Sequence, residues 1–159
     1  MNPSNAHTAQ VQSPDVAEAA LYRDLAYLMN AHPDRYRPLG DADMTVVFTI
    51  VGADRTTNIQ LVFEALSCVG IDAVPDGEAG LADFALVGPE SAWQAMFGDI
   101  VANGTATGPW TINSLALRGD RITLTGNDPM GLDKFSRFNQ TLQEFLDGAG
   151  RLEIVRSHS

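Results

Sequence analysis

The sequence predicts an α+β fold, in which a mainly antiparallel sheet of about five strands packs with an N-terminal, a central and a C-terminal helix. Short segments in which apolar and polar residues alternate predict the strands. Longer segments in which apolar residues recur every three or four positions predict the helices. Capping and turn residues separate most of these segments, so the boundaries of the expected elements can be placed.

The length of the chain, 159 residues, fits a single domain of ordinary size. Apolar residues make up 45% of the chain and charged residues 19%, which is the balance of a globular protein with a hydrophobic core. The beginning of the chain is polar. We therefore expect residues 1–12 to form a disordered polar tail and residues 13–155 to form one domain.

The first helix is expected to run from Pro14 to about Ala31. Ser13 can cap the free backbone amides at its start, and Asp15 favours the positive end of the helix dipole. Leucine and methionine then recur at helical spacing, and the dipeptide of His32 and a proline ends the pattern.

Three strands are expected next, at residues 44–51, 58–69 and 81–87. Turn sequences separate them, Gly-Ala-Asp-Arg at 52–55 and Pro-Asp-Gly at 75–77. Because the strands follow one another with turns between them, we expect an antiparallel meander.

A central helix is expected after Pro89, because the apolar residues of 92–101 follow the spacing of one helix face. The polar segment 103–109 ends it. Residues 110–117 form an apolar stretch that is too short to classify, and the alternation in 120–126 predicts a fourth strand.

A last helix is expected to begin at the capping sequence Asn127-Asp-Pro and to be closed by Gly148 and Gly150. Its apolar stripe is rich in phenylalanine. Residues 151–155 form either a fifth short strand or an ordered tail, and the sequence leaves both open.

The charge balance excludes one class of partner. Ten basic residues stand against twenty acidic ones, which gives a formal net charge of -10. A chain of this charge, with no basic stripe, would repel a phosphate backbone, so we expect no nucleic-acid partner. No stretch approaches the roughly 18 apolar residues that a membrane-spanning helix needs, so no integral membrane association is expected.

Cys68 is the one cysteine of the chain and lies in an apolar run. The chain therefore has no intramolecular disulfide framework and no cysteine cluster for zinc, and Cys68 is expected to be a small core residue. The polar start also lacks the pattern of a signal peptide. Together these features favour a cytoplasmic location.

The sequence contains no glycine-rich phosphate loop, no HExxH pattern, no nucleophile elbow and no calcium-binding loop. The three histidines, His7, His32 and His158, are spread over the two termini and the end of the first helix, which is a poor basis for a metal triad or a serine-histidine pair. We therefore predict no metal and no cofactor.

Two stretches of the chain resemble the sterol carrier protein 2 (SCP2) family. In residues 82–98, ADFALVGPESAWQAMFG, a strand leads directly into a tryptophan-bearing helix, and in 117–126, LRGDRITLTG, a glycine and a strand precede the amphipathic helix of 128–146. The resemblance covers about half of the chain and implies a curved sheet and a noncatalytic binding tunnel for sterols, fatty acyl chains or similar lipids. The chain departs from the family pattern at 103–108, a polar segment that would reshape the mouth of the cavity.

Large apolar side chains on the inferred inner faces, together with Trp110 at the mouth of the expected cavity, are the candidate contacts for such a ligand, because aromatic and methionine side chains adapt to variable shapes. The alternative is that the same side chains fill a solid core. The candidate ligand-binding residues are Phe48, Phe63, Phe84, Trp93, Met96, Phe97, Trp110, Phe135 and Phe138.

Two rival functions remain open at this stage. Asp83 and Glu64 lie within predicted strands, and either carboxylate, if buried, would suit proton transfer in a cofactor-independent lyase or isomerase that acts on a hydrophobic molecule. Their alternation with phenylalanine instead favours the solvent face. The acidic surface and the aromatic helix would also suit an interaction module, for self-association as a homodimer or for an enzyme partner.

Overall fold

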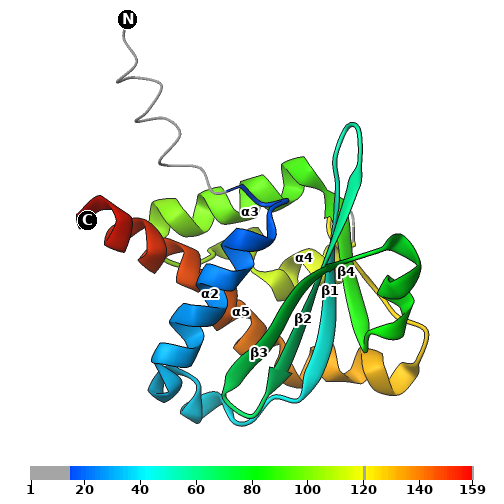
Figure 1. Cartoon of the computed structure of the whole chain (residues 1–159), viewed down its shortest axis with the longest axis horizontal. Helices are drawn as coiled ribbons and strands as arrows, with labels where there is room; N and C mark the ends of the chain where they lie inside the picture. The colour runs from blue at the N-terminus through cyan, green and yellow to red at the C-terminus, as the bar shows by residue number, and fades with distance from the viewer. Residues whose placement is uncertain (1–14, 120, 159) are drawn as a thin grey trace, which may run out of the picture.

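The computed structural model describes residues 15–119 and 121–158. The predicted polar tail and the predicted helix start at Ser13 and Pro14 lie outside the described residues. Figure 1 shows a sheet packed with helices. The elements are α2 (Ala19–Ala31), η1 (Pro33–Arg35), η2 (Arg37–Leu39), β1 (Met44–Val51), β2 (Thr56–Glu64), β3 (Ser67–Val74), η3 (Asp76–Leu81), β4 (Phe84–Pro89), α3 (Glu90–Asn103), η4 (Gly108–Trp110), α4 (Ile112–Arg118), β5 (Thr123–Thr125) and α5 (Pro129–His158).

The described residues form one five-stranded sheet with the strand order β3-β2-β1-β4-β5. The pairs β1–β2, β2–β3 and β4–β5 are antiparallel, whereas β4 runs parallel to β1. The α+β class and the mainly antiparallel sheet are thus confirmed. The predicted meander is wrong in its third member, because the segment expected as strand 81–87 pairs with the far side of β1 and a different strand, β3, completes the hairpins.

The strand predicted at 58–69 is two strands joined by a tight turn at Ala65 and Leu66. Ala65 has a φ of 55°, a conformation that glycine or asparagine adopts more readily. The turn is held from outside the hairpin, because the backbone N–H of Ala42 donates to the Ala65 carbonyl at 2.8 Å and Asp43 accepts from the Ala65 N–H at 3.3 Å. Residues 65 and 66 are not typical turn residues, so the sequence does not predict this turn. The contacts with residues 42 and 43 stabilise it instead.

Within the described residues, the helix predicted at 14–31 is present as α2, which begins at Ala19, and residues 15–18 form a turn that precedes it. The central helix is confirmed as α3, and the undecided segment after it forms η4 and α4. The fourth predicted strand is present as the short β5. The capping prediction for α5 is confirmed, because the Asp128 carboxylate accepts from the N–H of Met130 at 3.0 Å.

The two glycines expected to close the last helix lie inside it, and residues 151–155 continue the helix. A β-carbon at Gly148 would lie 3.2 Å from Cδ2 of Leu25 in α2, and one at Gly150 would lie 3.2 Å from Cα of Gly104 after α3. These glycines therefore let α5 approach two neighbouring helices closely. A glycine near the end of an apolar helical pattern can mark either the end of the helix or a close contact with another helix, and the sequence alone does not distinguish the two.

The inner face of the sheet packs against the helices. Phe48 of β1 contacts Tyr22 of α2 and Trp93 of α3, and Phe84 of β4 contacts Phe135 of α5. This layer between the sheet and the helices is the hydrophobic core.

The outer face of the sheet is covered in part by the connection from β3 to β4, which contains η3 and lies to the right of the sheet in Figure 1. Asn58 of β2 donates to Asp76 at 2.6 Å and accepts from Thr49 of β1 at 2.7 Å. This cover explains why Val47, on the same face as Thr49, is fully buried. No helix within the described residues is long and apolar enough to cross a membrane.

Candidate functional site

The structure places most of the predicted ligand-binding residues in the core. Trp110 and Phe138 are half-buried, and each has an arginine guanidinium over its ring, from Arg121 and Arg137 respectively. The others are at most 4% exposed: Phe48, Phe63, Phe84, Trp93, Met96, Phe97 and Phe135.

The buried rings pack against one another. The ring centres of Phe48 and Trp93 are 5.0 Å apart, and those of Phe84 and Phe135 are 5.5 Å apart. Phe63 contacts Phe145, a residue of the predicted aromatic stripe that was not among the ligand candidates, at 5.2 Å. Such tilted and edge-to-face contacts are the arrangement that aromatic side chains adopt in a filled core. The role of these residues as ligand contacts stays a prediction.

A mainly apolar cleft opens beside Trp110 at the surface. It has a volume of about 230 Å³ and is lined by Pro89, Ser91, Ala92, Ala95, Trp110 and Arg121. We call it the Trp110 cleft. The Arg121 guanidinium lies 4.6 Å from the centre of the indole ring, within the range of a cation–π interaction. The cleft thus combines an aromatic wall, small apolar side chains and one cation.

One wall of the Trp110 cleft follows from the direct passage of β4 into α3. Because β4 ends at Pro89 and α3 begins at the next residue, Ala92 and Ala95 lie beside the end of the strand, on one face of the helix. Their short side chains leave the space that the cleft occupies.

Gly88 brings Arg121 to this position. A β-carbon at Gly88 would lie 2.7 Å from the carbonyl oxygen of Arg121 and 2.9 Å from Cγ1 of Ile122. Glycine therefore allows the chain that enters β5 to lie directly against β4. Arg121 was missed by sequence reasoning, because nothing in its local sequence signals this approach.

The opposite wall is supplied by η4, which carries Trp110 between α3 and α4. The backbone N–H of Trp110 donates to the carbonyl of Thr107 at 3.0 Å. Thr107 is held in turn by Asp99 of α3, which accepts from its N–H at 2.7 Å and from its hydroxyl at 2.9 Å. Thr111 caps α4 by accepting from the N–H of Ser114 at 3.2 Å.

The carboxylates considered for catalysis occupy a second cleft, of about 480 Å³, at the other end of β1. Glu64 is exposed there, as its alternation with Phe63 predicts. Asp83 is half-buried and accepts from the N–H of Thr45 at 2.8 Å and from Lys134 of α5 at 3.2 Å. A β-carbon at Gly131 would collide with the Asp83 carbonyl, so α5 lies directly against this point. These contacts give Asp83 a structural role, that of joining β1, β4 and α5.

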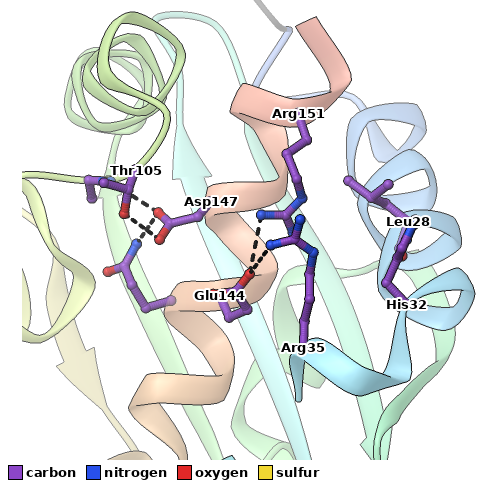
Figure 2. A network of polar contacts seen from close by, with 9 residues as sticks. Leu28, His32, Arg35, Thr105, Glu144, Asp147 and Arg151 are labelled. Atoms are coloured by element: carbon purple, nitrogen blue, oxygen red, sulfur yellow. Dashed lines mark hydrogen bonds and ion pairs between the residues drawn. The ribbon is translucent and has the colours of Figure 1, made fainter. Parts of the chain in front are cut away.

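The cysteine and the central histidine have local roles. Burial raises the pKa of the Cys68 thiol to about 11, so the thiol stays protonated and weakly nucleophilic at neutral pH. The prediction of a small core residue is confirmed. Nδ1 of His32 lies 3.0 Å from the carbonyl of Leu28, at the end of α2 (Figure 2). The described residues contain no group of three or more potential His, Cys, Asp or Glu ligands for a metal ion.

No family model matches the chain, and no curated protein matches it significantly.

Proposed function

We propose that the chain binds or transfers, without catalysis, a hydrophobic small molecule of the lipid, sterol or fatty acyl class, and that the Trp110 cleft is where the ligand is first held. The observation that carries the proposal is the half-buried Trp110 ring beside Ala92 and Ala95, with Arg121 over its face. A binding site needs an apolar surface that a ligand can reach and a few polar groups that orient it. The Trp110 cleft offers both.

The size of the Trp110 cleft limits what it can hold in this conformation. Pockets for drug-sized ligands have volumes of roughly 300–1,000 Å³. At about 230 Å³, the cleft accommodates the end of an acyl chain or one ring and not a whole sterol. Bound ligand beyond that end would lie along the surface or require Trp110 and η4 to move outwards.

Arg121 favours a ligand that carries a negative charge at one end. Arg121 is exposed, and its guanidinium lies over the indole face, a contact worth about 0.5–1 kcal/mol at an exposed site. An ion pair at an exposed site is worth up to about 1 kcal/mol, and a guanidinium stacked on a ring can still donate at its edge, so a carboxylate would add to the binding. A fatty acid should therefore bind more tightly than a neutral sterol.

Membership of the sterol carrier protein 2 family is part of the same proposal. The α+β class, the mainly antiparallel sheet and the direct passage from β4 into the helix that carries Trp93 agree with what the resemblance implies. The filled core favours a ligand that enters from the Trp110 cleft over one that occupies a tunnel already present.

The proposal is tested by titrating the purified protein with a fluorescent fatty acid and a fluorescent sterol, with native mass spectrometry to detect retained lipid. We expect saturable binding that Trp110→Ala weakens about tenfold, a loss of about 1.4 kcal/mol. Arg121→Gln should weaken binding of the fatty acid and leave that of the sterol unchanged.

Matched controls are Tyr27→Ala and Arg23→Gln, because both side chains are exposed on α2 and neither lines the Trp110 cleft. These variants should bind like the wild type. Absence of binding and of retained lipid in the wild type would overturn the function, and binding that Trp110→Ala leaves unchanged would overturn the site.

A further inference from the structure

The segment that carries Trp110 joins α3 to α4 and contains two backbone positions that favour glycine. Gly104 has a φ of 83° and Gly108 a φ of 52°. Such positions give a chain wide conformational freedom before it folds. The conformation of the segment therefore depends on contacts with its neighbours.

Asp147 of α5 supplies contacts before Trp110. Its carboxylate accepts from the hydroxyl of Thr105 at 2.7 Å (Figure 2). It also accepts from the backbone N–H of Ala106 at 3.0 Å. Asp147 is 7% exposed. A buried carboxylate that lost these donors would be left with unsatisfied charge, which makes this arrangement of the segment strongly preferred.

Gln143, one helical turn earlier in α5, supplies the contact after Trp110. Its Oε1 accepts from the N–H of Ile112 at 2.7 Å, and its Nε2 donates to Asp147 at 2.8 Å. The N–H of Ile112 belongs to the first turn of α4 and has no partner within that helix. A continuous set of hydrogen bonds thus joins Ala106 and Ile112, which flank Trp110, to the same two turns of α5.

A second carboxylate of α5, that of Glu144, lies on the side of the helix away from the Trp110 segment. Glu144 accepts ion pairs from Arg151 at 3.2 Å and from Arg35 at 3.8 Å, on the side towards α2 in Figure 2. Glu144 and Asp147 are therefore two carboxylates of one helix, close in sequence, of which one contacts the Trp110 segment. This difference provides a matched control.

We infer that Asp147 and Gln143 are positioning residues for the Trp110 cleft: they fix the segment 105–112, and with it the Trp110 ring, although neither lines the cleft. The inference rests on the proposed function for its ligand, while the positioning itself can be measured without one. Removing the Asp147 contacts should loosen Trp110 and lower ligand affinity together.

The test uses acrylamide quenching of tryptophan fluorescence in the full chain. Trp93 is 0% exposed, so quenching by acrylamide reports mainly on Trp110. We expect Asp147→Ala, which removes both carboxylate oxygens that accept from the segment, to raise the quenching constant at least twofold and to weaken binding of the fluorescent fatty acid severalfold. Glu144→Ala, with circular dichroism as the check on folding, should leave both values unchanged.

A second pair of variants keeps the test valid if Asp147→Ala fails to fold. Thr105→Val removes one donor to Asp147 and should raise quenching, whereas Thr105→Ser keeps the hydroxyl and should restore the wild-type value. The inference would be overturned by unchanged quenching in a folded Asp147→Ala. If Asp147→Ala does not fold, unchanged quenching in Thr105→Val would overturn it. Raised quenching in a protein whose wild type binds no fatty acid would support the positioning and overturn the proposed function.

Discussion

The two tryptophans of the chain lie in contrasting regions. Trp93 is fully buried, its indole N–H donates to the carbonyl of Thr49 at 3.2 Å, and its ring lies against Phe48. Trp110 is half-buried beside a cleft, with the exposed Arg121 over its face. An indole with its polar atom satisfied and its faces covered by packed side chains stabilises the fold. An indole covered by a displaceable cation can exchange that contact for a ligand.

The largest expected effect is in the core. Phe48→Ala should lower the free energy of unfolding by about 3–5 kcal/mol, because it removes a fully buried ring that contacts both Tyr22 and Trp93. Urea denaturation followed by circular dichroism measures this loss. A loss below about 1 kcal/mol would show that the core is loosely packed and would weaken the contrast with the Trp110 cleft.

Met96→Trp tests whether space exists beside the predicted ligand residues. Met96 is fully buried among the core residues, so the larger side chain should overpack the core and cost about 1–3 kcal/mol. Thermal unfolding gives the sign of the change. A stabilised variant with reduced ligand uptake would instead place a cavity next to Met96, in the region that we describe as filled.

Alkaline pH should destabilise the protein, because the buried thiol and phenol groups of the core ionise more easily in the unfolded chain than in the folded one. Burial raises the pKa of the Cys68 thiol from 9 to about 11, and it also raises the phenol pKa of Tyr22 and Tyr36. Below pH 9 the thiol is protonated in both the folded and the unfolded chain, so its contribution is intact. Between pH 9 and 11 it ionises mainly in the unfolded chain, which lowers stability by roughly 1–3 kcal/mol.

Denaturant unfolding at several pH values measures this loss, and Cys68→Ala should remove the thiol's share of it. A stability that stays constant from pH 9 to 11 would contradict the burial of the Cys68 thiol in the folded chain.

The smallest expected effect on stability is at the cleft. Arg121→Gln should change the free energy of unfolding by less than about 1 kcal/mol, because it removes one exposed cation–π contact. Thermal unfolding of this variant beside Arg23→Gln measures the difference. A loss as large as that of Phe48→Ala would mean that the Trp110 cleft belongs to the core.

The sequence was sufficient where local signals decide the structure. Alternation placed β1, helical spacing placed α3, and Asp128 marked the start of α5. It was insufficient where a distant contact decides. The turn at Ala65 depends on contacts with residues 42 and 43. Gly148 was expected to end the last helix, because glycine is common at helix ends, but it lies inside α5 and permits a close contact with α2.

The candidate site could be predicted only in part for the same reason. Trp110 was named because large aromatic side chains are visible in a sequence. Arg121 and the alanines of the cleft were not, because their meeting depends on the close approach that Gly88 allows. The hydrogen bonds of Asp147 likewise join residues about 40 positions apart, beyond the reach of any local pattern.

The most direct test of the central claim follows both indole N–H signals by nuclear magnetic resonance while decanoic acid is added to ¹⁵N-labelled protein. Each tryptophan gives one such signal, so the two regions are observed in the same titration. We predict that the Trp110 signal shifts with saturation, while the Trp93 signal, held by Thr49, stays in place. A shift of the Trp93 signal with Trp110 unchanged, or no shift of either, would contradict the account.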